Sequence, residues 1–380
     1  MATEDGKTTD DRYYRHDADA KDLSVVGHPW RKIDARHQVT GQRKYAGDLS
    51  FPRMLHMKLL RSTVAHANIK SIDTSKAEAL EGVRGVLVGT ELPVPFGILP
   101  VSQDEHTLCF DKVRFIGDPV VAIAAEDPDT AWEACRLVEI EYEELETITD
   151  IFKAHETPEP RIHDYGKGGG NFHRQENLEF GDLEQGFADS KHVREDLFFF
   201  GGNTHLPLEE HATVAVFDPD GKLHVLSSTQ TPHYLHRALT KVLHEHVPGH
   251  KIRVVACPNG GGFGGKSDPF NHEIAAAALA IKTGRPVKVE LTREEVFYCH
   301  RGRHPVLMKS KIGVDATGRI KALDFESYLD GGAYGSYGTA STFYTGALQT
   351  VTYAVENYHF RGARYFTNKA PCGPKRGHGT

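Results

Sequence analysis

The sequence has no apolar run of the length that crosses a bilayer, which takes about 18 residues or more. We therefore expect no transmembrane helix and no membrane partner. The segment from Met1 to Asp19 is polar and acidic, which is not the pattern of a secretory signal peptide. Its composition predicts a disordered N-terminal tail, which we place at residues 1–27.

Cysteine is scarce, and its spacing argues against two classes of metal site. No two cysteines form a C-x-x-C pair, so this chain carries no signal for a zinc site or an iron–sulfur cluster. An odd, scattered count fits a reducing compartment, and we expect a cytoplasmic protein. Histidine is abundant, with 23 residues, but no carboxylate or third ligand stands at a spacing that would complete a metal site. The five cysteines are Cys109, Cys135, Cys257, Cys299 and Cys372.

The net charge of −7 and the absence of a basic stripe argue against nucleic acid as the main partner. A length of 380 residues, 39% of them hydrophobic, suits two or three domains with real cores. Mixed strand and helix patterns predict α/β or α+β units. We predict a tail at 1–27, an α/β domain at 28–150, a Gly- and Pro-rich linker at 151–170 and a second domain at 171–380.

Local patterns place the elements of both predicted domains. Strands are expected at 54–60, 83–88, 119–125 and 138–142, with helices at 74–80 and 127–137. The second domain should contain a helix at 233–246 and two hairpins. These hairpins pair 213–217 with 223–228, and 309–314 with 320–328, through turns of the expected chemistry.

The most informative stretch is the glycine loop, which we define as residues 260–265 (GGGFGG), followed by Lys266 and Ser267. Five glycines in six residues would let a large group approach the backbone closely, because no Cβ stands in the way. The run 252–257 before it predicts a buried strand, and 270–283 after it predicts a helix. Asp268 is the expected N-cap, with Pro269 at the first helical position. Strand, loop and helix N-terminus together predict a site for an anionic ligand.

Two alternatives compete for the same loop. Residues 260–267 also match the phosphate-loop pattern G-x-x-x-x-G-K-S of nucleotide-binding proteins. That pattern would place Pro269 near the end of the first helical turn, where proline is poorly tolerated, and no apolar run ending in aspartate follows. The other alternative is structural: the loop merely lets a helix pack on a sheet.

An ordered set of motifs around this loop resembles the molybdopterin-binding subunits of the xanthine dehydrogenase and aldehyde oxidase family. The resemblance covers about residues 28–380 and implies an α+β fold. A small α/β hammerhead-type domain would precede the first molybdopterin-binding domain, whose second half would be absent or on another chain. The motifs are 39–41 (VTG), 117–120 (GDPV), 227–230 (SSTQ), the glycine loop, 283–287 (TGRPV), 302–305 (GRHP), 331–334 (GGAY) and 376–380 (RGHGT).

The resemblance implies roles for individual residues. Gln230 would hydrogen-bond an oxygen ligand of molybdenum, Phe263 and Gly264 would present backbone amides to the same centre, and Arg376 would lie near the metal. The other residues implied to bind the cofactor are Gly261, Gly262 and Gly265. The cofactor would be molybdopterin with molybdenum, the cytosine dinucleotide form being one alternative, with FAD and iron–sulfur clusters on partner subunits.

The implied chemistry is hydroxylation of an electron-poor carbon with water as the oxygen source. The family's glutamate general base would fall outside this chain, so we assign no catalytic residue here. Glu209, Glu210 and Glu273 are candidates by residue type alone. The implied partners are an iron–sulfur subunit, a flavin subunit and, as one alternative, a second molybdopterin-domain chain that completes the site.

Departures from the purine-oxidising pattern indicate the branch. Ser267 stands where purine oxidisers carry glutamate, Gly346 beside Tyr344 where they carry a substrate-binding arginine, and His378 where they carry a stacking ring. Missing polar partners would discriminate strongly against purines. Ser267, Tyr344 and His378 are therefore the predicted substrate-pocket residues.

Residues 343–348 (FYTGAL) and 94–100 (VPFGILP) look most similar to the 4-hydroxybenzoyl-CoA reductase branch. That branch implies hydroxylation, or the reverse dehydroxylation, of an aromatic acyl-CoA ring. The alternatives are a hydroxylase of an N-heterocycle or aldehyde and, from another class, a cofactor-binding scaffold half-subunit without activity alone.

Overall fold

The computed structural model describes residues 24–26, 28–156, 159–164, 170–299, 301–377 and 379. Most of the predicted tail, parts of the predicted linker and His378 lie outside this range. The chain divides into two compact units, residues 1–44 and 45–380. The described part of the first unit holds the short helix α2 (Ala35–Val39), and Arg43 forms an ion pair with Asp34 beside it.

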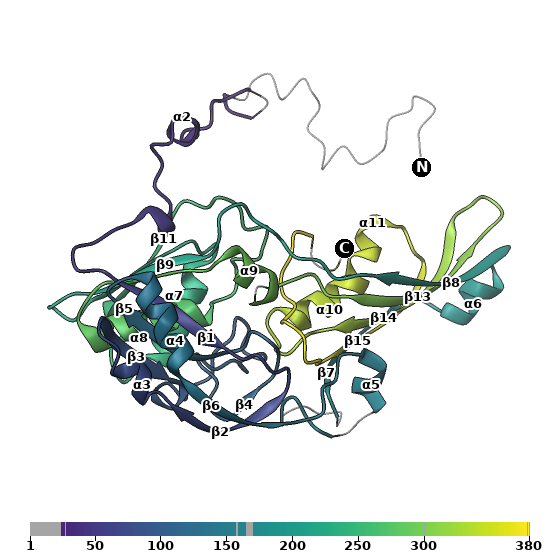
Figure 1. Cartoon of the computed structure of the whole chain (residues 1–380). Coiled ribbons are helices and arrows are strands. Elements are labelled where there is room, and N and C mark those ends of the chain that lie inside the picture. The colour runs from purple at the N-terminus through teal and green to yellow at the C-terminus, as the bar shows by residue number, and fades with distance from the viewer. Residues whose placement is uncertain are drawn as a thin grey trace. The chain divides into compact units, whose positions relative to one another are not determined.

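The second unit is built on a seven-stranded mixed sheet whose strand order is β11-β10-β9-β12-β1-β5-β3 (Figure 1). Strands from both predicted domains share this sheet, because β1 lies parallel to β12 with Leu55 opposite Val287. The strands are β1 (Leu55–Arg61), β3 (Val83–Val88), β5 (Pro119–Ala125), β9 (Ala212–Phe217), β10 (Leu223–Ser227), β11 (Ile252–Ala256) and β12 (Val287–Glu290).

Helix α8 (Asn271–Thr283) packs against this sheet and is apolar on nearly all sides, as expected of a helix inside a core. Gly284 ends it in the left-handed conformation, with φ of 62°. The helix is confirmed, but its predicted start is wrong. Phe270 is the N-cap residue, and the Glu273 side chain accepts from the Phe270 N–H at 2.8 Å.

Smaller elements surround the first sheet. A three-stranded sheet, in the order β4-β2-β6, lies beside two short helices, and α7 packs on β11. The helix predicted at 127–137 is confirmed as α4, and the Asp127 side chain caps it by accepting from Thr130 N–H at 2.9 Å. The helix predicted at 233–246 ends earlier, at Val242. The elements are β2 (Ala67–Asp73), α3 (Ser75–Glu78), η2 (Gly89–Glu91), β4 (Lys112–Val113), α4 (Pro128–Leu137), β6 (Glu139–Glu144), α7 (Pro232–Val242), η3 (Gly249–Lys251), η1 (Ala46–Asp48) and α9 (Arg293–Cys299).

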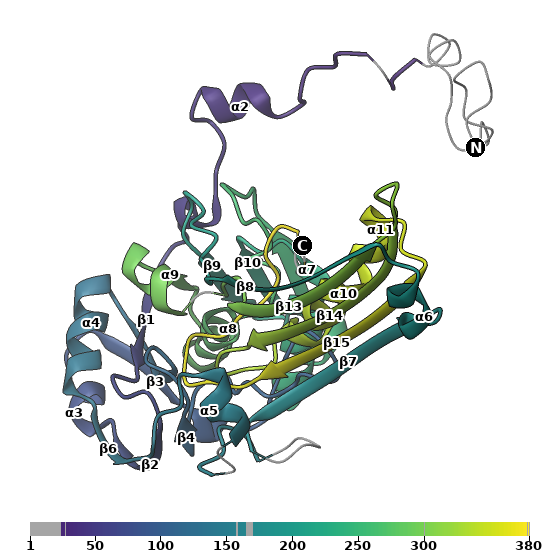
Figure 2. The ribbon, with the colours of Figure 1, turned by 90° about the vertical axis from the view of Figure 1, so that its right-hand side faces the viewer.

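A five-stranded sheet, in the order β7-β15-β14-β13-β8, forms the rest of the unit (Figure 2). Helix α10 covers one face, where Tyr358 donates to Gly346 O at 2.9 Å, and α5 contacts the other at Tyr365. The predicted hairpins are both confirmed. The elements are α5 (Ile151–Glu156), β7 (Phe172–Phe180), α6 (Leu183–Ala188), β8 (His192–Phe200), β13 (Val306–Val314), β14 (Ile320–Asp330), α10 (Gly338–Ala347), α11 (Gln349–Thr352) and β15 (Asn357–Tyr365).

Strand β11 was predicted to be buried, but it is an edge strand of the seven-stranded sheet. Arg253 and Ala256 are exposed, and only Ile252 is buried. The apolar sequence 252–257 did not reveal this, because exposure of an edge depends on which strands pair beside it. In the described part of the chain, no helix combines the length and apolar character that a bilayer span requires.

Candidate functional site

The glycine loop follows the end of β11, and a buried ion pair holds it in place. Lys266 Nζ lies 2.7 Å from Glu209 Oε2 and 3.1 Å from Glu210 O, and the lysine side chain is only 1% exposed. The same Glu209 oxygen accepts from Gly260 N–H at 2.7 Å. Burial lowers the pKa of the Lys266 ammonium below its ordinary value, although Glu209 opposes that shift. Lys266 therefore holds the loop in place through its contacts with Glu209 and Glu210. This structural role argues against the phosphate-loop alternative, in which the lysine would bind a phosphate group.

Three of the loop glycines are needed by the protein's own packing. A Cβ on Gly260 would lie 2.7 Å from Glu209 Cβ, and one on Gly262 would lie 2.4 Å from Gln230 Oε1. Gly264 has φ of 92°, and its Cβ would lie 2.8 Å from Pro374 O. The close approach to the bare backbone that was predicted for a ligand is therefore made on one side of the loop by the protein itself. These glycines first admit neighbouring protein atoms, and a ligand must reach the loop from its open side.

Gln230, three residues beyond the end of β10, lies against this loop. Its Oε1 accepts from Gly264 N–H at 3.0 Å and Lys266 N–H at 3.3 Å. These two donors fix the orientation of the amide. The Nε2 group has no hydrogen-bond partner among the described residues, and the side chain is exposed. Gln230 therefore offers a positioned donor, whereas the Gly264 amide is already used inside the protein.

Phe263 and Arg376 meet on the open side of the loop. Phe263 has φ of 51°, is 44% exposed, and its carbonyl accepts from Arg376 N–H at 2.9 Å. The Arg376 guanidinium lies 5.5 Å from the centre of the Phe263 ring, in cation–π contact. The structure thus brings together three residues from segments far apart in the sequence: Gln230, Phe263 and Arg376.

Backbone carbonyls, not acids, hold the cationic C-terminal segment in place. Arg303 donates to the carbonyls of Arg376 at 2.6 Å and Gly377 at 2.8 Å, and His205 Nε2 lies 2.8 Å from Pro374 O. Burial and the neighbouring arginines lower the pKa of Lys375. No carboxylate contacts Lys375 or Arg376 in the described ranges, so positive charge gathers beside the loop. The donor of Gln230 and this charge fit an anionic, oxygen-rich ligand.

A buried network fixes the far end of the loop. Asp268, predicted to cap α8, instead accepts from Arg301 Nε at 2.9 Å and from the Ser336 hydroxyl. Arg301 also contacts Glu105 from the first predicted domain, at 2.6 Å between Nη2 and Oε2. Burial raises the pKa of Glu105 to about 8, with Arg301 opposing the shift. The Asp268 carboxylate therefore forms a long-range ion pair with Arg301 and does not cap α8, as the local pattern had predicted.

Two of the three predicted substrate-pocket residues, Ser267 and Tyr344, lie in the described part of the chain. The Ser267 carbonyl accepts from the Thr231 hydroxyl below the loop. Tyr344 lies on α10, where a Cβ on Gly379 would come within 2.5 Å of it. His378 lies outside the described part of the chain, so the predicted pocket stays a prediction.

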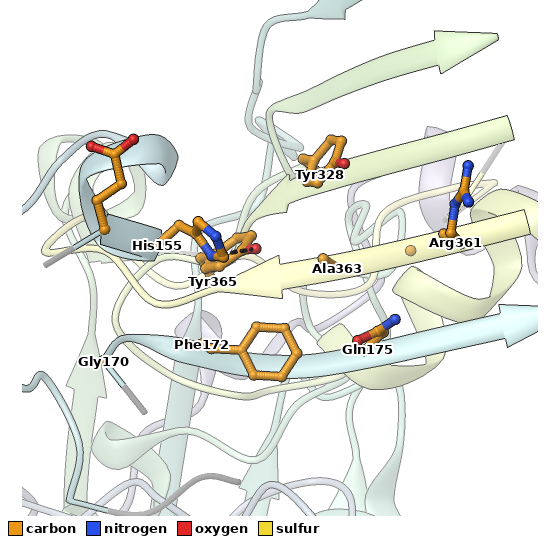
Figure 3. A pocket seen from close by; sticks show the side chains of 10 residues that line it. His155, Gly170, Phe172, Gln175, Tyr328, Arg361, Ala363 and Tyr365 are labelled. Atoms are coloured by element: carbon orange, nitrogen blue, oxygen red, sulfur yellow. Dashed lines mark hydrogen bonds between the residues drawn. The ribbon is translucent and has the colours of Figure 1, made fainter. Parts of the chain in front are cut away.

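Two cavities adjoin the five-stranded sheet on its opposite faces. One of about 190 Å³ lies beside α10 and the final motif, with Phe200, Arg303, Thr345 and Gly379 in its wall. The other, of about 600 Å³, lies beside α5 and is shown in Figure 3, which places His155 against Tyr365 and Arg361 at the far side. None of the predicted site residues lines the larger cavity.

Sequence reasoning missed the residues that hold the site together. Residue type alone made Glu209 a candidate general base, and the sequence assigned no role to Arg301 or Arg303. The only sequence signal for Arg303 was its place in the motif 302–305, because the carbonyls it binds lie about 70 positions away, at Arg376 and Gly377. Among the described residues no group of three or more metal-ligating side chains occurs.

Comparison with known proteins identifies two parts of the chain. Residues 40–146 match the a/b hammerhead domain of aldehyde oxidase and xanthine dehydrogenase, and residues 163–380 match the molybdopterin cofactor-binding domain. The chain belongs to the xanthine dehydrogenase and aldehyde oxidase family of molybdenum-dependent oxidoreductases. The fold class predicted from the sequence is thereby confirmed.

The relatives within this family differ in how much of their length the chain covers. It is 38% identical to the nicotinate dehydrogenase large molybdopterin subunit of Eubacterium barkeri, over 94% of the chain and 83% of that protein. It is 37% identical to a probable xanthine dehydrogenase chain of Bacillus subtilis, over 93% of the chain but 47% of that protein. Quinoline 2-oxidoreductase from Pseudomonas putida 86 superposes with a TM-score of 0.84 at 29% identity, covering 93% of the chain and 46% of that structure. The chain thus spans about half of several relatives.

Proposed function

We propose that the chain is the part of a molybdenum hydroxylase that holds the molybdopterin cofactor at the glycine loop. The observation that carries the proposal is the meeting of Gln230, Phe263 and Arg376 on the open side of the loop. Molybdopterin is anionic and bulky, and the site offers a fixed amide donor and a cation without an acidic partner in the described ranges. When bound, the group would supply the redox-active metal that accepts the electrons of the hydroxylation.

Each residue has a distinct part in this proposal. The Gln230 amide would donate to an oxygen at the metal, because its carbonyl is already held by two loop amides. Arg376 would balance negative charge, and its position is set by the Phe263 carbonyl. The remaining loop residues Gly261, Gly262 and Gly265 would shape the wall against which the cofactor rests.

For the substrate we propose an aromatic ring. An N-heterocycle is supported by the nicotinate relative and by the likeness to quinoline 2-oxidoreductase. An aromatic acyl-CoA, such as 4-hydroxybenzoyl-CoA, is supported by the segments 343–348 and 94–100. Purine is disfavoured by Ser267 and Gly346. The proposal includes cytoplasmic location, an iron–sulfur subunit, a flavin subunit and, as one alternative, a second molybdopterin-domain chain.

The test begins with the complex purified through a tag on this chain. Molybdenum measured by mass spectrometry and pterin measured by fluorescence should be present in equal amounts. Gln230→Leu and Arg376→Met should each lower both, while Lys282→Met, an exposed lysine at the end of α8, should not. Full molybdenum content in both site variants would contradict the assignment of the loop.

Substrate class and enzyme class are tested on the same preparation. Turnover of nicotinate would support the N-heterocycle, turnover of 4-hydroxybenzoyl-CoA would support the acyl-CoA, and turnover of xanthine alone would contradict both. The scaffold alternative predicts that the isolated chain binds no molybdenum until the second chain is added. Stoichiometric metal in the isolated chain would argue against that alternative.

A further inference from the structure

The larger cavity lies on the face of the five-stranded sheet that α10 does not cover (Figure 3). Helix α5 contacts this face at Tyr365, and α6 contacts it further along β14, at Ala322. The stretch beside α5 stays open and holds a cavity of about 600 Å³, a size that suits a small-molecule ligand. Among the described residues, neither the glycine loop nor Gln230 or Arg376 contributes to its wall. The cavity is therefore a second candidate site.

Aromatic side chains form the walls of this cavity, and a small residue forms its floor. Ala363 lies at the centre, with Tyr328 of β14 opposite it on one side and Gln175 of β7 on the other. Tyr365 follows two positions along β15, on the same face of the sheet, and meets the Phe172 ring edge to face with 5.6 Å between centres. Figure 3 shows these three rings around the position of Ala363. The small side chain keeps the space between the rings open.

The rings are held in place by the protein itself. Tyr365 is buried, and its hydroxyl lies 3.1 Å from His155 Nδ1 on α5. The Tyr328 hydroxyl donates to Glu326 Oε2 at 2.7 Å. Because these contacts fix the rings before any ligand arrives, binding loses little free energy to ordering them.

The charge around the cavity is negative. Arg361, at the far side in Figure 3, is shared by two carboxylates: its Nη2 lies 2.6 Å from Glu326 Oε1 and 3.2 Å from Asp324 Oδ1. Glu156, exposed at the end of α5, adds a carboxylate with no ion-pair partner among the described residues. With histidine counted as neutral, three acids stand against one arginine. This balance attracts a cation and repels an anion.

The carboxylates beside the rings are already engaged, which restricts the kind of cation. A primary ammonium carries three N–H donors, and burying it without acceptors costs free energy. Both oxygens of Glu326 are used, by Arg361 and Tyr328, and neither Ala363 nor the ring faces offer an acceptor. A quaternary ammonium has no donor to satisfy, and the faces of aromatic rings attract it. The cavity therefore fits a quaternary ammonium better than an amine.

We propose that this cavity binds a quaternary ammonium compound, with the cationic head over Ala363 and among the rings of Phe172, Tyr328 and Tyr365. Glu156 would attract the cation from solution through long-range charge, which salt screens. The proposal goes beyond the proposed function and does not depend on it, because no described residue of the glycine loop lines this cavity. The ligand would be recognised by its permanent charge and by its lack of N–H groups.

The test uses the complex purified through a tag on this chain, titrated with choline and followed by ligand-observed NMR. Choline and its uncharged isostere 3,3-dimethylbutanol have nearly the same shape, so the comparison isolates the charge. We expect choline to bind with a Kd of about 1 mM or below and the isostere to bind about tenfold more weakly. Added salt should weaken the binding of choline. Equal affinities, or no measurable binding of choline, would overturn the proposal.

Substitutions in this chain locate the binding to the cavity. Phe172→Tyr keeps the ring and should keep the affinity, whereas Phe172→Leu should weaken it about fivefold. Ala363→Phe should abolish binding, because the added ring would occupy the space above the floor. Phe152→Leu, at an exposed position of α5 outside the cavity, is the matched control and should change nothing. Unchanged affinity in both Phe172→Leu and Ala363→Phe would overturn the proposal.

A surface substitution keeps the test decisive if either of these variants unfolds. The unfolding midpoint and circular dichroism of each variant are compared with those of the unaltered complex. Glu156→Gln alters an exposed side chain, so the fold should be unchanged. This variant should bind choline about twofold to threefold more weakly and with less dependence on salt. The same affinity and the same salt dependence as the unaltered complex would refute the role of the charge.

Discussion

Replacement of Lys266 by methionine gives the sharpest test of how the glycine loop is held. The lysine is almost fully buried, and Nζ makes one contact to Glu209 and one to the Glu210 carbonyl. Methionine fills a similar volume but leaves the Glu209 carboxylate with only the Gly260 N–H. Removing one partner of a buried ion pair costs about 3–5 kcal/mol, and we expect about 3 because the Glu209 side chain retains 14% exposure. The unfolding midpoint should fall by about 6 °C, at about 2 °C per kcal/mol for a chain of this size.

Urea unfolding of four proteins isolates the pair itself: wild type, Lys266→Met, Glu209→Gln and the double variant. The double variant should be more stable than the sum of the singles predicts, by about 2 kcal/mol, because it leaves no unpaired buried charge. Lys282→Met is the matched control in the helix that follows the loop, since its pair with Glu91 is exposed and should contribute less than about 1 kcal/mol. Additive single effects, or a loss below about 1 kcal/mol for Lys266→Met, would refute the reasoning.

Single contacts elsewhere in the chain give three further predictions. Burial raises the pKa of Glu273 from its ordinary 4.5 to about 7. The Glu273 carboxyl group therefore stabilises the fold fully below pH 4.5, and this stabilisation is lost as the pH rises through 7. Glu273→Gln should remove about 3 kcal/mol of this pH dependence of the free energy of unfolding, measured by urea titration. A pH profile unchanged by this substitution would contradict it. Gly346→Ala would bring a methyl within 2.1 Å of the Phe360 ring, and the free energy of unfolding should drop by about 1–3 kcal/mol; equal stability would show that the ring can move aside. Asp127→Ala removes the side-chain cap of α4 and should cost about 1 kcal/mol, whereas Asp127→Asn should keep most of it.

Local sequence patterns predicted local structure well. The first hairpin turns through residues 218–221, where Asp218 N–H donates to Lys222 O at 2.8 Å and Gly221 has φ of 78°. Turn chemistry, alternation and helical periodicity act over a few residues, so the sequence contains them directly. The glycine loop and the helix after it were predicted for the same reason.

Pairings between distant segments could not be predicted in this way. The parallel contact of β1 with β12 joins residues more than 200 positions apart and merges strands of both predicted domains into one sheet. Its register depends on side chains of many elements at once. The domain boundary at 151–170 therefore stays a prediction, and strands from both sides of it share one sheet.

Asp268 shows how a long-range contact defeats a local rule. Aspartate followed by proline before an apolar run is typical of a helix start, and the prediction followed that rule. In the structure Asp268 instead pairs with the buried guanidinium of Arg301. Leaving a buried arginine without a partner would lower the free energy of unfolding far more than losing a helix cap does. Phe270 is then the N-cap residue of α8, and its N–H donates to the Glu273 side chain.

The same long-range contacts explain why the site is ready before a ligand arrives. Glu209 and Gln230 hold the loop from two sides, so its amides do not need a cofactor to find their partners. Arg303 fixes the backbone around Arg376 through carbonyl groups, which leaves the positive charge of Arg376 without an acid to neutralise it among the described residues. Binding an anionic group to such a site costs little ordering entropy, because the donors are already in place. The Arg376 guanidinium, held beside the exposed Phe263 ring by a cation–π contact, is the charge that the proposed anionic ligand would neutralise.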